Sequence, residues 1–216
     1  MFFSPYWLLF ALPGIVLAFW AQSRVKRAYK KYSKVRTARG LSGAEVARSL
    51  LDSQGLYDVQ IEENKGFLSD HYDPRSKTLR LSPEVYRAPS VTAAGIAAHE
   101  MGHALQHSNG YMPLQVRSAI VPVAKFGSTL APWLVIGGFL LRFTALAWVG
   151  VVLFGLAVIF TLITLPVEFD ATKRAKKLLV GNGVLIGNEL EGANKVLDAA
   201  ALTYVAAAVA AIGQLI

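Results

Sequence analysis

The chain has 216 residues, which is enough for one modest domain with or without membrane spans and excludes a chain of several enzymes. Apolar residues make up 54% of it, charged residues 17%, and the mean hydropathy is +0.41, so the composition excludes intrinsic disorder and favours a membrane protein. Cysteine is absent, which excludes disulfides and thiolate metal ligands, and the net charge of +8 raises nucleic acid as a partner to be weighed.

Residues 1–23 are predicted to form a first transmembrane helix. No charged side chain occurs from Phe2 to Gln22, and Trp7 and Trp20 stand near the ends of this stretch, as aromatic rings do at membrane interfaces. A cleaved signal peptide is disfavoured because no basic residue precedes the apolar stretch. We therefore expect a retained membrane anchor.

Residues 24–40 form a basic juxtamembrane segment. It holds eight cations and no acid, and these cations equal the net charge of the chain: Arg24, Lys26, Arg27, Lys30, Lys31, Lys34, Arg36 and Arg39. A basic run beside an apolar span is typical of a cytosolic loop that meets anionic lipid headgroups. The position of the charge favours the lipid bilayer as a partner and argues against nucleic acid.

Residues 41–118 are polar enough to fold in water and are predicted to form the catalytic region. Ser42 and Glu45 make a capping box at the start of a helix that ends near Gly55. Ser90 caps a longer helix that runs to about His107. Between these two helices the pattern predicts an α+β arrangement with a short β-hairpin.

The hairpin is expected from two short apolar stretches, residues 56–61 and 78–81, separated by a turn at Asp70 to Pro74. We expect the second of these strands, near Lys77 to Leu81, to offer an exposed edge to which the backbone of a peptide substrate can add.

Residues 119–165 are predicted to form a transmembrane hairpin of two helices joined around Arg142. Residues 166–199 form a polar helical segment, and residues 200–216 form a fourth, Ala-rich span. Four spans place residues 24–118 and 166–199 on one face of the membrane, and these two segments hold 20 of the 22 Lys and Arg residues. By the positive-inside rule this face is cytosolic, and the amino terminus lies outside the cell membrane.

The helix from Ser90 contains the HExxH pattern His99-Glu100-Met101-Gly102-His103. Two histidines four positions apart lie about 40° apart around a helix and about 6 Å apart along it, so both imidazoles can reach one metal ion. Glu100 can then hydrogen-bond a metal-bound water and act as general base. The alternative is an ordinary helix with solvated histidines.

A catalytic zinc site needs a third protein ligand and one open position. His107 lies about 12 Å along the helix from His99, which is too far for three residues of one straight helix to share an ion. Glu168 and Asp170 follow the third span, and the predicted topology returns Glu168 to the face that carries the two histidines. Asp170 stays open as a ligand, with an ordinary role at a helix start as its alternative.

Five stretches carry a family resemblance and span most of the chain: residues 41–47, 69–74, 98–104, 166–171 and 196–206. On these stretches the chain resembles the bacterial, membrane-anchored "putative neutral zinc metallopeptidase" family, whose members are YugP-like. It is more loosely similar to HtpX-type and CaaX-prenyl membrane proteases. In those proteins a Glu soon after a transmembrane hairpin is the third zinc ligand, and an Asp four residues later supports the site. Glu168 matches that Glu, whereas Thr172 stands where the Asp would be, so the partners of the zinc histidines are not identified.

The sequence therefore predicts a mainly α integral membrane protein with about four transmembrane helices and a small cytosolic zincin-like α+β catalytic domain. The expected activity is that of a Zn²⁺-dependent metalloendopeptidase acting on a peptide or protein, with His99, His103 and Glu168 as ligands and Glu100 as base. His71 or Tyr72 is a candidate donor to the oxyanion. The alternatives are an intramembrane site-2-type protease and a zinc-binding membrane scaffold that does not cut. The substrate and the oligomeric state are not predicted.

Overall fold

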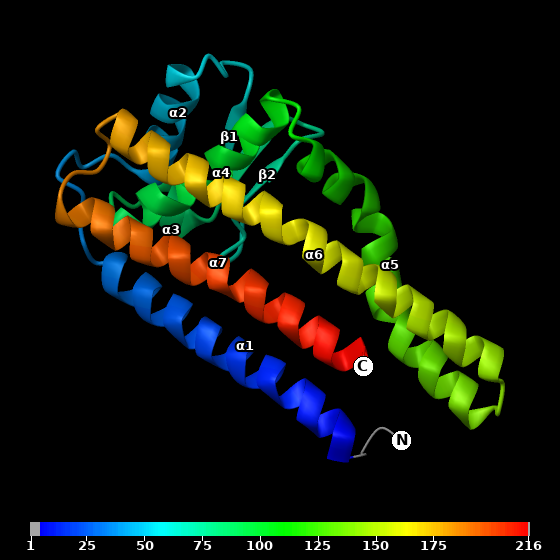
Figure 1. Ribbon diagram of the computed structural model, residues 1–216. Helices are drawn as coiled ribbons and strands as arrows, with labels where there is room; N and C mark the ends of the chain where they lie inside the picture. The colour runs from blue at the N-terminus through cyan, green and yellow to red at the C-terminus, as the bar shows by residue number, and fades with distance from the viewer. Residues whose placement is uncertain (1–4, 216) are drawn as a thin grey trace. The chain divides into compact units, whose positions relative to one another are not determined.

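The computed structural model describes residues 5–215, with side chains from residue 9 onward (Figure 1). Within these residues the chain is mostly helical and contains one small sheet. It divides into two compact units. The first comprises residues 1–21, 112–167 and 203–216, and the second comprises residues 22–111 and 168–202.

The first unit contains a helical hairpin made by α5 (Met112–Leu140) and the first part of α6 (Thr144–Gly181). The two helices run antiparallel, as Figure 1 shows, and the turn between them falls at Arg142, whose φ of 52° is left-handed. At Gly138 the helices come so close that a Cβ atom would lie 2.5 Å from the backbone nitrogen of Ala147. The tight joint expected around Arg142 is therefore present.

The first unit also contains the start of α1 (Pro5–Tyr32) and the end of α7 (Asn188–Leu215). These helices pack closely at two glycines. A Cβ atom at Gly14 would lie 2.5 Å from the Cα atom of Ala210, and one at Gly213 would lie 2.3 Å from the carbonyl oxygen of Phe10. Small residues allow such an approach between apolar helices.

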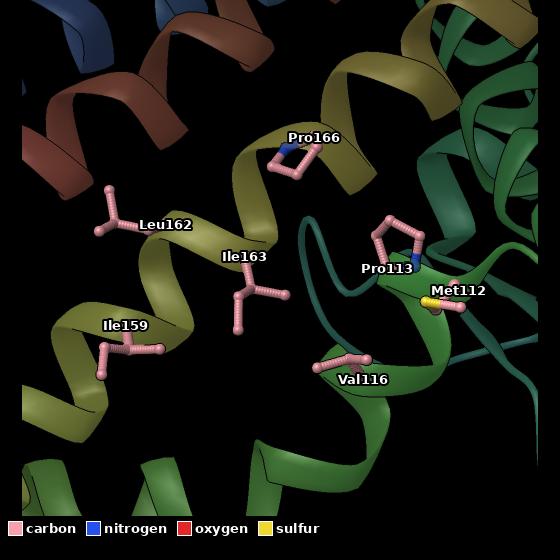
Figure 2. Close-up of a pocket in the computed structure, with 7 residues that line it drawn as sticks. All are labelled: Met112, Pro113, Val116, Ile159, Leu162, Ile163 and Pro166. Carbon is pink, nitrogen blue, oxygen red and sulfur yellow. The ribbon is translucent and has the colours of Figure 1, made fainter.

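An apolar cavity of about 410 Å³ lies between the start of α5 and the middle of α6 (Figure 2). All the side chains that line it are apolar: Met112, Pro113, Val116, Ile159, Leu162, Ile163 and Pro166. This lining offers no group for acid–base chemistry or metal binding.

Three helices of the described residues are long and apolar enough to cross a membrane, namely α5, α6 and α7. The helix α1 is not among them. The beginning of the first expected span, residues 1–4, lies outside the described residues, so the first of the four expected spans stays a prediction.

The helix α6 differs from the prediction, because it does not end at the third span. It continues as one helix through Pro166 to Gly181. A proline inside a helix removes one backbone hydrogen bond but need not end the helix in an apolar segment. As a result, Glu168 lies on the same helix as the apolar residues that precede it.

In the second unit, three strands form a sheet of order β1-β3-β2, with β1 at Gln60–Glu63, β2 at His71–Asp73 and β3 at Thr78–Leu81. β3 pairs parallel with β1 and antiparallel with β2. The sheet does contain a short hairpin, but its strands are β2 and β3. The prediction that residues 56–61 and 78–81 form the hairpin was wrong.

The predicted turn at Asp70 to Pro74 was also wrong, since these residues contain the whole of β2. The Asp73 carboxylate accepts from the Arg75 backbone nitrogen and from the Ser76 hydroxyl, and Lys77 has a φ of 49°, so the chain turns after Asp73. Because the turn follows β2, the chain returns as β3 between β1 and β2, in the middle of the sheet. The expectation that β3 offers a free edge is thereby overturned.

The helices of this unit start as the sequence indicates. In α2 (Gly43–Ser53) both hydrogen bonds of the Ser42–Glu45 capping box are present. Ser90 caps α4 (Val91–Ser108) by accepting a hydrogen bond from the Ala93 backbone nitrogen. The short α3 (Pro83–Tyr86) lies between them in the sequence.

The helix α4 is almost wholly buried, and small side chains let its neighbours come close. A Cβ atom at Gly102 would lie 2.6 Å from the carbonyl oxygen of Ala171 on α6. Gly102 lies between His99 and His103 on α4, and Ala171 directly follows Asp170 on α6. The close approach of the two backbones therefore falls beside the histidines of α4 and the acidic residues of α6.

Candidate metal centre

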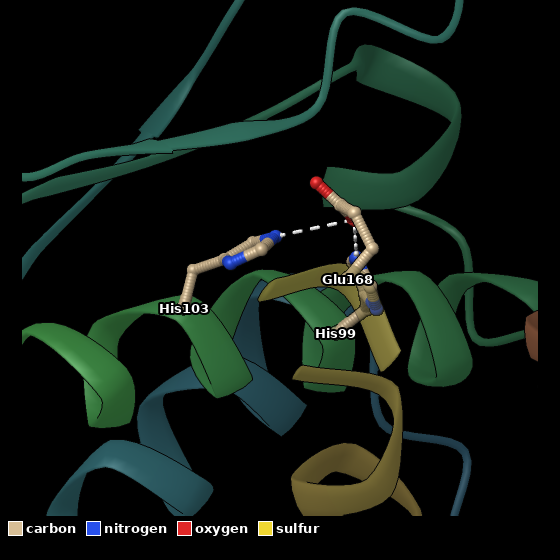
Figure 3. A group of neighbouring side chains, drawn as sticks. All are labelled: His99, His103 and Glu168. Atoms are coloured by element: carbon tan, nitrogen blue, oxygen red, sulfur yellow. Dashed lines mark hydrogen bonds and ion pairs between the residues drawn. The ribbon is translucent and has the colours of Figure 1, made fainter. Parts of the chain in front are cut away.

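Three side chains from α4 and α6 point toward one another (Figure 3). Glu168 Oε2 lies 3.1 Å from His99 Nε2 and 3.6 Å from His103 Nε2. The possible ligand atoms of the three residues all lie within 4.8 Å of one another. Glu168 is 2% exposed and His103 is 7% exposed, so the group is largely shielded from solvent.

The spacing of these atoms fits a zinc ion. In a tetrahedral site with bonds of about 2.0 to 2.1 Å, ligand atoms lie about 3.3 Å apart, and the two observed distances fall on either side of this value. Two imidazoles and one carboxylate are also a ligand set of catalytic zinc sites, which keep a fourth position for water.

The other ring nitrogen of each histidine faces a neutral group. His99 Nδ1 lies 3.3 Å from the Thr172 hydroxyl, and His103 Nδ1 lies 3.0 Å from Gln106 Oε1. Partners at this nitrogen orient the ring and its Nε2. Thr172 occupies the position at which the resemblance predicted a supporting residue. Gln106 was missed, although it follows His103 by three positions and so lies on the same face of the helix.

Glu100 directly follows His99 in the sequence, and its side chain is buried. Burial raises the pKa of the Glu100 carboxyl to about 7; His99 opposes this rise and Glu168 adds to it. The backbone of Tyr72 on β2 hydrogen-bonds the same carboxyl. A carboxyl with a pKa near neutrality can both take up and release a proton at physiological pH.

Comparison with known proteins agrees with this geometry. The model of a family described as "Putative neutral zinc metallopeptidase" matches residues 7–216. The chain belongs to this family. The chain is also similar to the "Putative membrane protease YugP" of Bacillus subtilis (strain 168), with 49% identity over 209 residues that cover 97% of this chain and 93% of the relative. No solved structure matches the chain.

Membership of a zinc metallopeptidase family supports zinc as the metal of the His99, His103 and Glu168 group. Together with the three apolar helices, the similarity to a membrane protease supports association with a membrane.

Asp170, the other candidate ligand of this family member, has different partners. Its Oδ2 accepts from Gln106 Nε2 at 2.9 Å and from Arg174 Nε at 2.5 Å. Among the described residues, the group that could hold a metal consists of His99, His103 and Glu168. Asp170 therefore contacts Gln106, the partner of His103 Nδ1, and does not belong to the group of His99, His103 and Glu168.

The remaining candidates also have partners outside the three ligands. The Tyr72 hydroxyl lies 2.9 Å from His107 Nδ1, and burial raises the pKa of Tyr72 to about 12. The ring of His71 is exposed, and its Nδ1 lies 2.8 Å from the Ser69 carbonyl oxygen. The pair of Tyr72 and His107 joins β2 to the last turn of α4, which gives His107 a structural contact.

Proposed function

We propose that this protein is a membrane-embedded zinc metalloendopeptidase. The observation that carries the proposal is the spacing of His99 Nε2, His103 Nε2 and Glu168 Oε2, which suits one tetrahedral ion. The family description and the name of the Bacillus relative support the same activity.

In this proposal His99, His103 and Glu168 hold the metal, and Glu100 is the general base. A zinc ion bound here would acidify a water molecule and polarise the scissile carbonyl. Glu100 would take one proton from the water whose oxygen adds to the scissile carbonyl carbon, and would give that proton to the amine that leaves as the C–N bond breaks. The pKa of about 7 suits both transfers, because a group near its pKa can act in either direction.

The partners of this site are a peptide or protein substrate and the lipid bilayer. The concentration of Lys and Arg in residues 24–118 and 166–199 supports a cytosolic position of the metal centre in the cell membrane, with the amino terminus outside.

Two features favour hydrolysis of exposed peptides over the alternatives. The histidines lie on α4, an 18-residue helix that is not among the three candidate spans of the described residues, which disfavours a site-2-type intramembrane protease. A structural zinc site fills its fourth position and needs no base, so the three-residue group beside the buried Glu100 disfavours a scaffold.

The test is Glu100→Gln, which keeps the shape of the side chain and removes the base. We expect the variant to bind zinc as the unchanged protein does and to hydrolyse an unfolded model protein about a hundredfold to ten-thousandfold more slowly. Glu62→Gln, an exposed glutamate paired with Arg80, is the matched control and should cleave at the full rate. Zinc binding without hydrolysis in both the unchanged protein and the control would favour the scaffold instead.

A further inference from the structure

We infer that Gln106 and Asp170 are positioning residues that set the tautomer of His103 and so aim its Nε2 lone pair at the metal. The inference rests on the proposed zinc site. It concerns residues of this chain only, and it assigns to Asp170 a role other than that of a ligand.

A continuous row of hydrogen bonds leads from the histidine to the surface of α6. His103 Nδ1 lies 3.0 Å from Gln106 Oε1, and Gln106 Nε2 lies 2.9 Å from Asp170 Oδ2. The same Oδ2 accepts from Arg174 Nε at 2.5 Å, and the Arg174 guanidinium lies over the ring of Tyr111, 5.8 Å from its centroid. Gln106 is 0% exposed, so water does not compete with this arrangement.

The charge of Asp170 decides which way the glutamine amide faces. An amide has a donor end and an acceptor end, whereas a carboxylate only accepts. The donor Nε2 of Gln106 must therefore face Asp170, and its Oε1 must face His103. With the amide reversed, two acceptors would meet inside the protein, where an unmade hydrogen bond is costly.

The direction of the amide then decides the histidine tautomer. Because Gln106 Oε1 can only accept, His103 Nδ1 must carry the proton that it donates. The neutral ring keeps its lone pair on Nε2, the atom that lies 3.6 Å from Glu168 Oε2. In the opposite tautomer a proton would occupy the place of the metal.

The two histidines differ in this respect. Thr172 faces His99 Nδ1 with a hydroxyl, which can donate as well as accept, so it does not select one tautomer. In the metal-free protein the Glu168 carboxylate, which can only accept, lies 3.1 Å from His99 Nε2, so His99 carries its proton on Nε2 until a metal replaces it. His103 Nε2 is farther from that carboxylate, at 3.6 Å, and the shorter contact of its Nδ1 with Gln106 sets its tautomer before any metal binds.

The first measurement needs no variant. In protein carrying ¹⁵N-labelled histidine and stripped of metal by a chelator, long-range proton–nitrogen spectra distinguish the two neutral tautomers. We expect His103 to carry its proton on Nδ1. A proton on Nε2 of His103 would overturn the inference.

The second measurement exchanges the amide and the carboxylate between positions 106 and 170. Gln106→Glu alone sets two carboxylates against each other, and Asp170→Asn alone removes the charge that orients the amide. We expect each to weaken zinc binding about tenfold to a hundredfold, the usual effect of losing a partner of a ligating histidine. The double variant again pairs one carboxylate with one amide and leaves an acceptor for His103, so zinc affinity should recover.

Zinc affinity is measured by competition with a chromophoric chelator, with Asp52→Asn as control, because Asp52 also pairs with an arginine four positions away. If the unchanged protein binds zinc and the single variants bind it equally well, this inference falls and the proposed function stands. If the double variant fails to recover, the polarity argument falls. If the unchanged protein binds no zinc, the proposed function itself falls, while the spectra still decide the tautomer of His103.

Discussion

Glu168 and Asp170 lie two positions apart on α6, yet their carboxylates face different groups. Glu168 Oε2 faces the Nε2 atoms of His99 and His103, where a metal ion can replace both contacts. Asp170 meets two donors, Gln106 and Arg174, which satisfy it without a metal. The two carboxylates carry the same charge, but the groups that face them give Glu168 the proposed role of a metal ligand and leave Asp170 with hydrogen-bond donors.

Glu168→Ala should abolish zinc binding, because it removes a ligand, whereas Asp170→Ala should retain one zinc ion with weaker affinity. For the unchanged protein, free zinc at about a hundred times its dissociation constant should raise the free energy of unfolding by about 2.7 kcal/mol. Neither zinc nor a chelator should shift the unfolding of Glu168→Ala. Metal analysis of the purified variants, with thermal unfolding in detergent, measures both effects.

Glu62→Ala provides the control, since Glu62 forms an exposed ion pair with Arg80. The assignment of the ligands would be contradicted if the Asp170 variant lost the metal and the Glu168 variant kept it.

At the level of helices and strands, the site depends on how closely α4 approaches α6. The backbone carbonyl of Ala171 lies where a side chain at Gly102 would begin. Gly102 therefore lets the helix that carries the histidines come near the helix that carries Glu168.

Gly102→Ala should lower the free energy of unfolding by about 1 to 3 kcal/mol, the usual cost of overpacking. Because a backbone carbonyl cannot rotate aside, the helices must separate, and zinc affinity should fall as well. Gly95→Ala is a matched control on the same helix. Its new Cβ atom would meet the Ala193 side chain at an ordinary 3.6 Å, and its helix propensity improves by up to about 1 kcal/mol.

Denaturant unfolding and zinc titration of the two alanine variants give the comparison. Equal stability and equal zinc affinity of both would show that the close approach at Gly102 does not support the site.

For the protein as a whole, the proposed orientation in the bilayer rests on the distribution of charge and on the expected number of spans. The natural chain has no cysteine, so single cysteines report accessibility without interference. Ser53 lies in the exposed last turn of α2, and Phe143 lies in the turn between α5 and α6 with 57% of its surface exposed.

We expect a membrane-impermeant maleimide to label Ser53→Cys only from the cytosolic side and Phe143→Cys only from the outer side. The physical reason is the excess of Lys and Arg in residues 24–118 and 166–199, which resists transfer across the membrane. Right-side-out and inverted vesicles provide the two directions. Labelling of Ser53→Cys from outside would reverse the proposed orientation.

Several features could be predicted from the chain alone because their causes are local. The spacing of His99 and His103 depends only on the pitch of one helix, and the Ser42–Glu45 capping box depends on residues three positions apart. The lengths of the apolar stretches predicted the helices α5, α6 and α7, which the structure contains. The family resemblance, which rested on motifs along most of the chain, is confirmed.

Other features depend on which distant segments meet, and these were missed or mistaken. Strand β3 accepts partners on both sides, although nothing within Thr78–Leu81 distinguishes a central strand from an edge. Gln106 acquires a role only because Asp170, 64 positions later, faces its amide. Local hydrogen bonds and helical pitch act within a few residues, whereas strand order and the orientation of a buried amide are settled by groups that come together only when the chain packs.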